Sequence, residues 1–473
     1  MKKSFDYHTV VIGAGRVGSH FAKNLARFGA KVLIIDKNEI FGGKQFNRDV
    51  PIQILQNTLD KIEKKMSLDE KFKFFRSELN LKLHNLIEKT GQNSFTKLGI
   101  DSLIGTVHIV DKNNLIINEK KISFKYCVFA VGSRFLKPLI KGLDYSKYET
   151  IENWYNFDKN FNSVTIIGND KNSLELAITF AESGSIVYLL NKNDNFINLL
   201  KDDMLLKFQN YARKNNFYII NNASIKNINK TETDQFQIEY SIGTYSLFLI
   251  SDRLILGGTK KGNLDKVSKD IIFETNLRNF PISDRQLRLR NNKNFFAIGS
   301  CFGPYIDSNQ GFYQANLIIN NLIENDERNV FDFENFSSNI NAKIGFSFIG
   351  MHEDEIKSQK IFYNKFEYDF KESNLSIVND KDKGFIRAYF DKKHRLLNAS
   401  IVGENITEIS SVFLWMYNSQ IKINSLNSFQ TLPFTNLEIL KEILTKYIFE
   451  YVFNEKKLAF IHKYYLKTDK NRG

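Results

Sequence analysis

The sequence is poor in cysteine and proline and has no long apolar run. Only two of its 473 residues are cysteine, Cys127 and Cys301, and they lie far apart. That spacing excludes a disulfide framework and any Cys-x-x-Cys metal or redox motif. No apolar run reaches the roughly 18 residues that a transmembrane helix needs, and no apolar signal stretch precedes the first predicted strand. These absences predict a cytoplasmic protein without membrane insertion.

The charge balance is basic, but the basic residues are dispersed. The net charge is +13 and the sequence pI is about 9.2, with lysines scattered along the whole chain. No dense basic block and no nucleic-acid motif occurs, so the composition indicates a solvated lysine-rich surface and no nucleic-acid partner. The seven histidines are also dispersed, and no metal site is predicted.

Residues 8–36 have the pattern of a strand, a turn, a helix and a second strand. The turn reads Gly13-Ala14-Gly15-Arg16-Val17-Gly18, and the second strand ends at Asp36. Gly13 permits the tight turn, Gly15 lets the backbone approach a pyrophosphate, and Gly18 lets the helix pack on the strand. The helix N-terminus attracts anions, and Asp36 can accept hydrogen bonds from a ribose. This unit predicts a dinucleotide site.

Later segments extend the pattern. A second strand–turn–helix–strand unit covers residues 164–190, and another strand ends at Gly299. Residues from about 340 onward alternate as strands and then as helices. We therefore predict three domains, the first of them built from two separate segments. Their predicted ranges are 1–150 and 271–335 for the first domain, 151–270 for the second, and 336–473 for the C-terminal domain.

Several segments carry a resemblance to a known family. They are Gly42-Gly43, residues 130–134 (Ala-Val-Gly-Ser-Arg), residues 297–299 (Ala-Ile-Gly) and residues 348–355. In this order they resemble the pyridine nucleotide–disulfide oxidoreductases, the family of dihydrolipoamide dehydrogenase, glutathione reductase and mercuric reductase. The resemblance implies an α/β fold with two Rossmann-like domains, one for FAD and one for NAD(P). It also implies a C-terminal α+β dimerisation domain, and hence a homodimer.

The resemblance assigns residues to the two cofactors. Those implied for FAD are Gly13, Gly15, Arg16, Val17, Gly18, Asp36, Lys37, Gly43, Lys44, Val107, Ala130, Gly132, Ser133, Gly299 and Ser300. Those implied for NAD(P) are Gly168, Asn169, Glu175, Asn191, Lys192 and Gly257. The second set is open to question, because Asp170 stands where the backbone should approach a pyrophosphate. Its carboxylate would repel the phosphates, so binding of NAD(P)H is left open.

The sequence departs from the family wherever disulfide chemistry is performed. Gln45 stands at the first redox cysteine, and a deletion near Val50 removes the second. Gln53 replaces the lysine beside the flavin, and Leu432 replaces the histidine that transfers protons. A dithiol relay needs one thiolate to attack and a second thiol to resolve, so disulfide reduction by the family route is excluded.

Two functions remain. The first is an FAD-dependent NAD(P)H oxidoreductase that transfers electrons directly from flavin to a small acceptor. The alternative is a non-catalytic flavoprotein that acts as a binding or assembly partner. Solvation is the default expectation for Lys44 and Arg48, with FAD phosphates or an anionic substrate as the alternative. Cys127 and Cys301 are expected to be small buried hydrophobic residues.

Overall fold

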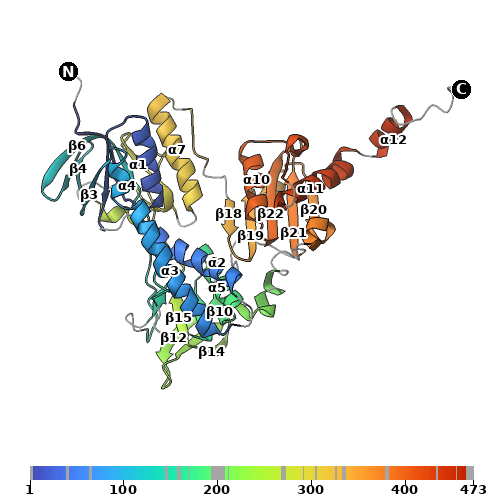
Figure 1. Ribbon diagram of the computed structural model, residues 1–473, viewed down its shortest axis with the longest axis horizontal. Helices are drawn as coiled ribbons and strands as arrows, with labels where there is room; N and C mark the ends of the chain where they lie inside the picture. The colour runs from blue at the N-terminus through green and yellow to red at the C-terminus, as the bar shows by residue number, and fades with distance from the viewer. Residues whose placement is uncertain are drawn as a thin grey trace. The chain divides into compact units, whose positions relative to one another are not determined.

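The computed structural model forms two compact units, which Figure 1 shows. The first unit contains residues 1–197 and 211–333, and the C-terminal unit contains residues 198–210 and 334–473. The structure describes residues 4–38, 42–62, 66–143, 148–156, 161–168, 170–192, 208–210, 212–267, 273–290, 292–303, 306–324, 328–332, 337–378, 383–432, 435–453 and 455–464.

A largely parallel sheet forms the first part of the first unit. The apolar run 8–12 becomes its central strand β1 (Tyr7–Ile12), which pairs in parallel with β2 (Val32–Asp36) and β6 (Lys120–Phe129). The path is completed by β3 (Asp101–Ile104), β5 (Asn114–Ile117) and β4 (His108–Asp111), while β17 (Phe295–Ala297) pairs with β6. Helices α1 (Arg16–Arg27) and α7 (Ser308–Glu324) lie side by side, and their apolar faces belong to one buried cluster (Figure 1).

A second parallel sheet follows. Its order is β11 (Phe217–Ile220), β10 (Ile186–Leu190), β9 (Ser163–Ile167), β15 (Arg253–Leu256) and β8 (Glu149–Thr150). Helix α5 (Lys171–Ser183) packs on it and contacts α2 (Val50–Lys61), which contacts α3 (Leu68–Thr90). The remaining elements are α4 (Asn93–Thr96), the antiparallel strands β12 (Ser224–Lys230), β13 (Phe236–Ile242) and β14 (Tyr245–Ser251), the pair β7 (Ser133–Phe135) and β16 (Lys260–Gly262), and the short turns η1 (Gln45–Asp49), η2 (Leu264–Lys266) and η3 (Gly299–Cys301).

The C-terminal unit is an antiparallel sheet with helices. Its order is β18 (Ser337–Ile340), β19 (Ile344–Gly350), β22 (Leu396–Glu404), β21 (Gly384–Phe390) and β20 (Asn364–Asp369). The helices are α8 (Glu353–Ser358), α9 (Asn374–Val378), α10 (Thr407–Asn418), α11 (Ile439–Tyr447) and α12 (Glu455–Tyr464). Short turns are η4 (Phe370–Glu372), η5 (Ile423–Ser428), η6 (Asn436–Glu438) and η7 (Ile448–Val452). The predicted α+β character of the C-terminal domain is confirmed.

The predicted fold class is therefore confirmed. Two parallel sheets with helices stand in the first unit and an α+β arrangement in the second. Among the described residues no helix is long and apolar enough to cross a membrane.

Candidate functional site

The first glycine loop (residues 13–18) is closely packed where glycines were predicted. Gly13 has a φ of 105°, and a Cβ there would lie 2.4 Å from the Ala130 carbonyl oxygen. A Cβ on Gly18 would lie 2.0 Å from the Gly13 carbonyl oxygen. Neither position accepts a side chain, so the turn and the contact between α1 and β1 both require glycine.

Gly15 faces open space. It is the N-cap of α1 in extended backbone (φ −66°, ψ −179°), and a Cβ there would meet nothing within 4 Å. No side chain among the described residues caps this helix. The first-turn N–H groups and the positive end of the helix dipole are therefore available to an anion at Gly15.

Asp36 ties the end of β2 to the same loop. Its Oδ2 accepts the Ala14 N–H at 2.7 Å, and its Oδ1 accepts the Asn38 N–H at 3.0 Å. A carboxylate has about four lone-pair positions, so it retains acceptor capacity for a ribose hydroxyl beside the pyrophosphate position.

Segments that are distant in sequence meet at this loop. The Gly42 N–H donates to the Ala14 carbonyl at 2.8 Å, and a Cβ on Gly43 would lie 3.2 Å from the Gly15 Cα. Gly132 has a φ of 68°, and a Cβ there would lie 3.5 Å from the Ser300 Oγ. Residues 42–43 thus contact the first glycine loop, and Gly132 lies beside Ser300.

Helix α7 packs against the first glycine loop and the Gly299 segment. The Gly299 N–H donates to the Gln314 Oε1 at 2.7 Å, and a Cβ on Gly311 would lie 2.5 Å from a Val17 methyl group. The Arg16 guanidinium carbon lies 5.2 Å from the centre of the Phe312 ring. Arg16 and Val17 therefore pack against α7.

Two residues predicted for FAD differ from the rest in their surroundings. Val107 is 6% exposed and belongs to the apolar cluster that also contains Ile12 and Ile35. Lys37 is exposed just beyond the end of β2. The buried position of Val107 makes it part of the sheet core, whereas Lys37 has the solvent exposure of an ordinary surface lysine.

The second glycine loop (residues 168–173) has a different chemistry. Asp170 is the N-cap of α5, and its Oδ1 accepts the N–H groups of Asn172 at 3.0 Å and Ser173 at 3.4 Å. Its Oδ2 accepts the Ser173 hydroxyl at 2.6 Å and the Gly258 N–H at 2.8 Å. The carboxylate thus binds donors from α5 and from the segment after β15.

The other residues predicted for NAD(P) are spread around this loop. The Gly168 N–H donates to the Leu190 carbonyl and the Gly257 N–H to the Ile167 carbonyl, which fixes both glycines in the sheet edge. Asn191 is 1% exposed and donates to the Asn221 Oδ1 at 3.4 Å. Lys192 is exposed, and Asn169 lies outside the described residues.

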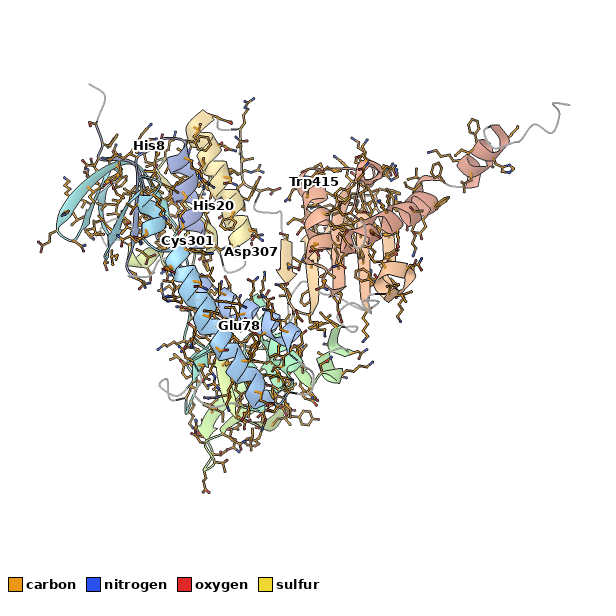
Figure 2. All side chains as sticks on the ribbon, viewed as in Figure 1. His8, His20, Glu78, Cys301, Asp307 and Trp415 are labelled. Carbon is orange, nitrogen blue, oxygen red and sulfur yellow. The ribbon has the colours of Figure 1, made fainter. Side chains whose placement is uncertain are left out.

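Glu175 lies near a lysine from its own helix. It is 8% exposed, and its Oε1 lies 3.9 Å from the Lys171 Nζ. The same Nζ lies 3.8 Å from a carboxylate oxygen of Asp307, which is labelled in Figure 2. Gln53, considered from the sequence as a partner of Glu175, is exposed on α2.

A charged cluster in the first unit contains Lys44 and Arg48, and the expectation that these two side chains are solvated is wrong. Their side chains are only 29% and 17% exposed. The Lys44 ammonium bonds Glu152, and the Arg48 Nε lies 2.7 Å from the Asp49 Oδ1. Lys44 is thus held by a carboxylate 108 residues away, whereas Arg48 is held by its neighbour Asp49. The sequence pattern does not reveal the first of these contacts.

Lys260 is the member of this cluster that sequence reasoning missed. It is 8% exposed on β16, and its Nζ donates to the Asn172 Oδ1 at 3.2 Å. Its Nζ lies 5.3 Å from the centre of the Phe135 ring, and the Lys44 Nζ lies 5.6 Å from the same centre. Burial lowers the pKa of Lys260 to about 8. Its only sequence signal is its position directly after Gly257, Gly258 and Thr259.

Both cysteines are free and fully buried. Burial raises the pKa of Cys301 to about 12 and that of Cys127 well above its ordinary value. The Cys301 Sγ donates to the Phe129 carbonyl at 3.6 Å, inside the first unit (Figure 2). Neither group forms a thiolate at neutral pH, and the thiolate is the reactive form.

The positions of the missing catalytic groups are occupied as follows. The segment Gln45–Asp49 forms a π-helical turn before α2, although the side chain of Gln45 lies outside the description. Val50 is buried at the start of α2. In the C-terminal unit Leu432 is 76% exposed, while Pro433 lies outside the described residues. Among described residues no group of three or more histidine, cysteine and acidic side chains is placed to hold a metal.

Comparison with known families gives two matches. Residues 7–316 match the model described as "Pyridine nucleotide-disulphide oxidoreductase", and residues 339–433 match its dimerisation domain. A dihydrolipoyl dehydrogenase of Mycoplasma genitalium is 20% identical over 469 residues, covering 94% of this chain and 99% of the relative. A soluble pyridine nucleotide transhydrogenase of Pseudomonas paraeruginosa is 21% identical, covering 91% and 95%.

Solved structures share the same fold. The HOCl-induced flavoprotein disulfide reductase RclA from Escherichia coli, as a Cu(II) complex, superimposes with a TM-score of 0.80. It is 18% identical and covers 94% of this chain and 100% of its own. The structural similarity extends over both units.

Proposed function

The chain belongs to the pyridine nucleotide-disulphide oxidoreductase family, and on that premise we propose an FAD-dependent oxidoreductase that delivers electrons directly to a small acceptor. The observation that carries this proposal is the state of the thiols. The chain has two cysteines, both buried and free, and neither lies in the Gln45–Val50 segment. When bound, FAD supplies hydride and single-electron transfer, which requires no thiol.

The first glycine loop fits the cofactor. The open space at Gly15 and the uncapped N-terminus of α1 would hold the pyrophosphate, because backbone N–H groups there have no competing side-chain acceptor among the described residues. Asp36 would accept from the ribose while it orients the loop through Ala14. The Ser300 hydroxyl, beside Gly132, would supply a neutral hydrogen bond to the same cofactor.

A reduced nicotinamide is the proposed donor. Relatives at 20–21% identity are a dihydrolipoyl dehydrogenase and a soluble pyridine nucleotide transhydrogenase, and the second of these names a reaction between nicotinamide cofactors. The acceptor is proposed as a small molecule, since the chain has only two cysteines, both free and buried, and so no cysteine pair to relay electrons from the flavin.

A non-catalytic flavoprotein is the second candidate. One observation favours it: the Asp170 carboxylate caps the helix whose N-terminus would bind the nicotinamide pyrophosphate. The two candidates differ in flavin reduction. Mixing the FAD-saturated protein with millimolar NADH or NADPH in a stopped-flow instrument should bleach the flavin absorbance if the first candidate is correct. An unchanged spectrum over minutes would favour the second.

We also propose a homodimer formed by the C-terminal unit. The match to the dimerisation domain and the exposed apolar side chains Trp415 (Figure 2) and Leu432 support this assembly. Sedimentation at micromolar concentration tests it, and a monomer there would contradict it. The cytoplasm stays the predicted compartment.

Thiol reagents provide the first prediction. N-ethylmaleimide should leave NAD(P)H-dependent reduction of a quinone or of oxygen unchanged, because burial keeps both thiols protonated. The same protein should reduce neither lipoamide nor glutathione disulfide.

Cysteine variants are the control for this prediction. Cys127→Ser and Cys301→Ser should retain the direct activity, apart from any loss due to burying a hydroxyl. A disulfide reductase activity in the wild type that disappears in either variant would show that one of these thiols acts in turnover, and the proposal of a thiol-free enzyme would fail.

A further inference from the structure

The second glycine loop already contains an anion, supplied by its own chain. Four donors converge on the Asp170 carboxylate, at distances between 2.6 and 3.4 Å. Three are backbone N–H groups, two from the first turn of α5 and one from Gly258. Backbone N–H groups at a helix start are the groups that bind the pyrophosphate of a dinucleotide.

Ser173 fills the rest of the loop. A Cβ on Gly257 would lie 2.1 Å from its Oγ, and a Cβ on Gly168 would lie 2.5 Å from the same atom. The hydroxyl therefore packs directly over both glycines, and Ser173 is fully buried. At the matching position of the first loop, Gly18 has no side chain, and the loop above Gly15 is open.

Neighbouring cations hold the carboxylate in place. Lys260 is buried beside Asn172, the residue whose N–H binds Asp170, and its Nζ contacts the Asn172 side chain. Arg48 and Lys260 both interact electrostatically with Asp170. The carboxylate is thus stabilised by charge as well as by hydrogen bonds, which makes its displacement costly.

We propose that the Asp170 carboxylate occupies the pyrophosphate position of the second glycine loop, so that a nicotinamide dinucleotide binds only after this side chain leaves. The inference deepens the proposed function, on which it rests, by naming the residue that controls access of the donor. A pyrophosphate needs the N–H groups that Asp170 occupies, and its negative charge is repelled by the carboxylate. Both effects weaken binding in the wild-type protein.

Removing the carboxylate tests the inference. Asp170→Gly restores the glycine of the dinucleotide loop, and Asp170→Ser keeps an N-cap hydroxyl for α5 while it removes the charge. Binding of ADP-ribose to the FAD-saturated full-length protein is measured by titration calorimetry, with flavin absorbance showing that FAD stays bound. We expect both variants to bind ADP-ribose at least about tenfold more tightly than the wild type, an effect the size of one lost charge-assisted hydrogen bond.

A matched control removes another carboxylate of the same sheet domain. The Asp252 Oδ2 accepts the N–H groups of Asn162 and Ser163, each at 2.9 Å, away from the loop. Asp252→Ser should disturb local stability in the same way and leave the affinity for ADP-ribose unchanged. A gain in this variant would attribute the effect to general loosening of the domain and overturn the inference.

The outcomes separate the inference from the proposed function. Equal affinity of the wild type and folded Asp170→Ser overturns the inference, and Asp170→Ser decides the matter if Asp170→Gly does not fold. Tighter binding of ADP-ribose without reduction of the flavin by NADH supports the inference and contradicts the proposed function. Tighter binding together with faster flavin reduction at low NADH concentration supports both.

Discussion

The two glycine loops of the first unit have the same strand–helix arrangement, but only the second has an acidic side chain at the start of its helix. Each follows a central parallel strand, β1 or β9, and leads into a helix that packs on its sheet. In the first, Gly15 leaves the start of α1 uncapped by any described side chain. In the second, Asp170 caps the start of α5 with a carboxylate.

The difference shows that the backbone framework and the ligand site are separable. The strand–helix geometry survives in the second loop although Asp170 and Ser173 replace two glycines of the motif. A carboxylate at the N-cap stabilises a helix by itself, by roughly 1 kcal/mol. The second loop therefore contains a stable helix start that needs no bound phosphate, whereas the first depends on a ligand or water to satisfy its N–H groups.

The largest effect is expected when an aspartate is placed in the first loop at the position that Asp170 has in the second. Gly15→Asp should weaken FAD binding by about a thousandfold or more, equivalent to about 4 kcal/mol. The new carboxylate would accept the N–H groups of α1 and repel the pyrophosphate. Titration of apoprotein with FAD, followed by fluorescence quenching, measures the effect.

The same variant has a second expected outcome, which distinguishes it from misfolding. Gly15 has extended backbone, and a Cβ there meets nothing within 4 Å, so the apoprotein should fold and its melting temperature should rise slightly. Gly15→Ala is the control and should weaken FAD binding much less. Wild-type FAD affinity in Gly15→Asp would show that the cofactor does not use this loop.

Short sequence patterns predicted the two glycine loops well, because most of the contacts that require particular residues there are made within each strand–turn–helix–strand segment. The apolar run before Gly13 and the acid after the next strand were sufficient to place β1, α1 and β2, and Gly13 and Gly18 are forced by backbone contacts within the same unit. The sequence also indicated that Asp170 is unfavourable for phosphates. It did not reveal the Gly258 donor, because that contact joins segments 88 residues apart.

Charged side chains were predicted less well for the same reason. Lys44 and Arg48 lie in a polar loop, which by composition alone indicates solvation, yet Lys44 finds Glu152 108 residues away. Lys260 is buried only because β16 pairs with β7 and places it beside Asn172. Burial created by pairing of distant strands has no periodic signature in a short window of sequence.

The next prediction concerns Lys260, the buried lysine beside the second glycine loop. Its pKa falls from 10.5 to about 8 through burial, so Lys260→Met should raise the free energy of unfolding at pH 7 by up to about 3 kcal/mol. Between pH 8 and 10.5 the unfolded lysine binds a proton that the folded one does not. Wild-type stability therefore rises with pH through this window, and the advantage of the variant shrinks.

Urea unfolding followed by tryptophan fluorescence at pH 7 and at high pH measures this difference. Trp154 is 1% exposed and stacks on Phe75, so its emission should report on the packing near the second sheet. Lys261→Met is the matched control, because Lys261 is the next residue of β16 and its Nζ lies 3.8 Å from Asp265 with a partly exposed side chain. It should change stability by no more than about 0.5 kcal/mol. A loss of stability in Lys260→Met at both pH values would show that its contact with Asn172 outweighs the cost of burial.

The smallest expected effect concerns two residues of the first unit at matching places, Asp36 at the end of β2 and Asn191 just after β10. Asp36→Asn should weaken FAD binding by about tenfold, because the amide keeps one acceptor for the Ala14 N–H but loses the charge and the second oxygen. Asp101→Asn on the adjacent strand β3 is the control. Its Oδ2 accepts the Tyr7 hydroxyl at 2.9 Å, away from the loop, and its FAD affinity should equal that of the wild type. An unchanged FAD affinity in Asp36→Asn would show that this carboxylate does not bind the ribose. A loss of FAD affinity as large as that of Gly15→Asp would instead mean that Asp36 maintains the conformation of the first glycine loop. The first loop would then need its acid for structure, whereas the second loop has Asn191, bonded to Asn221, at the matching position.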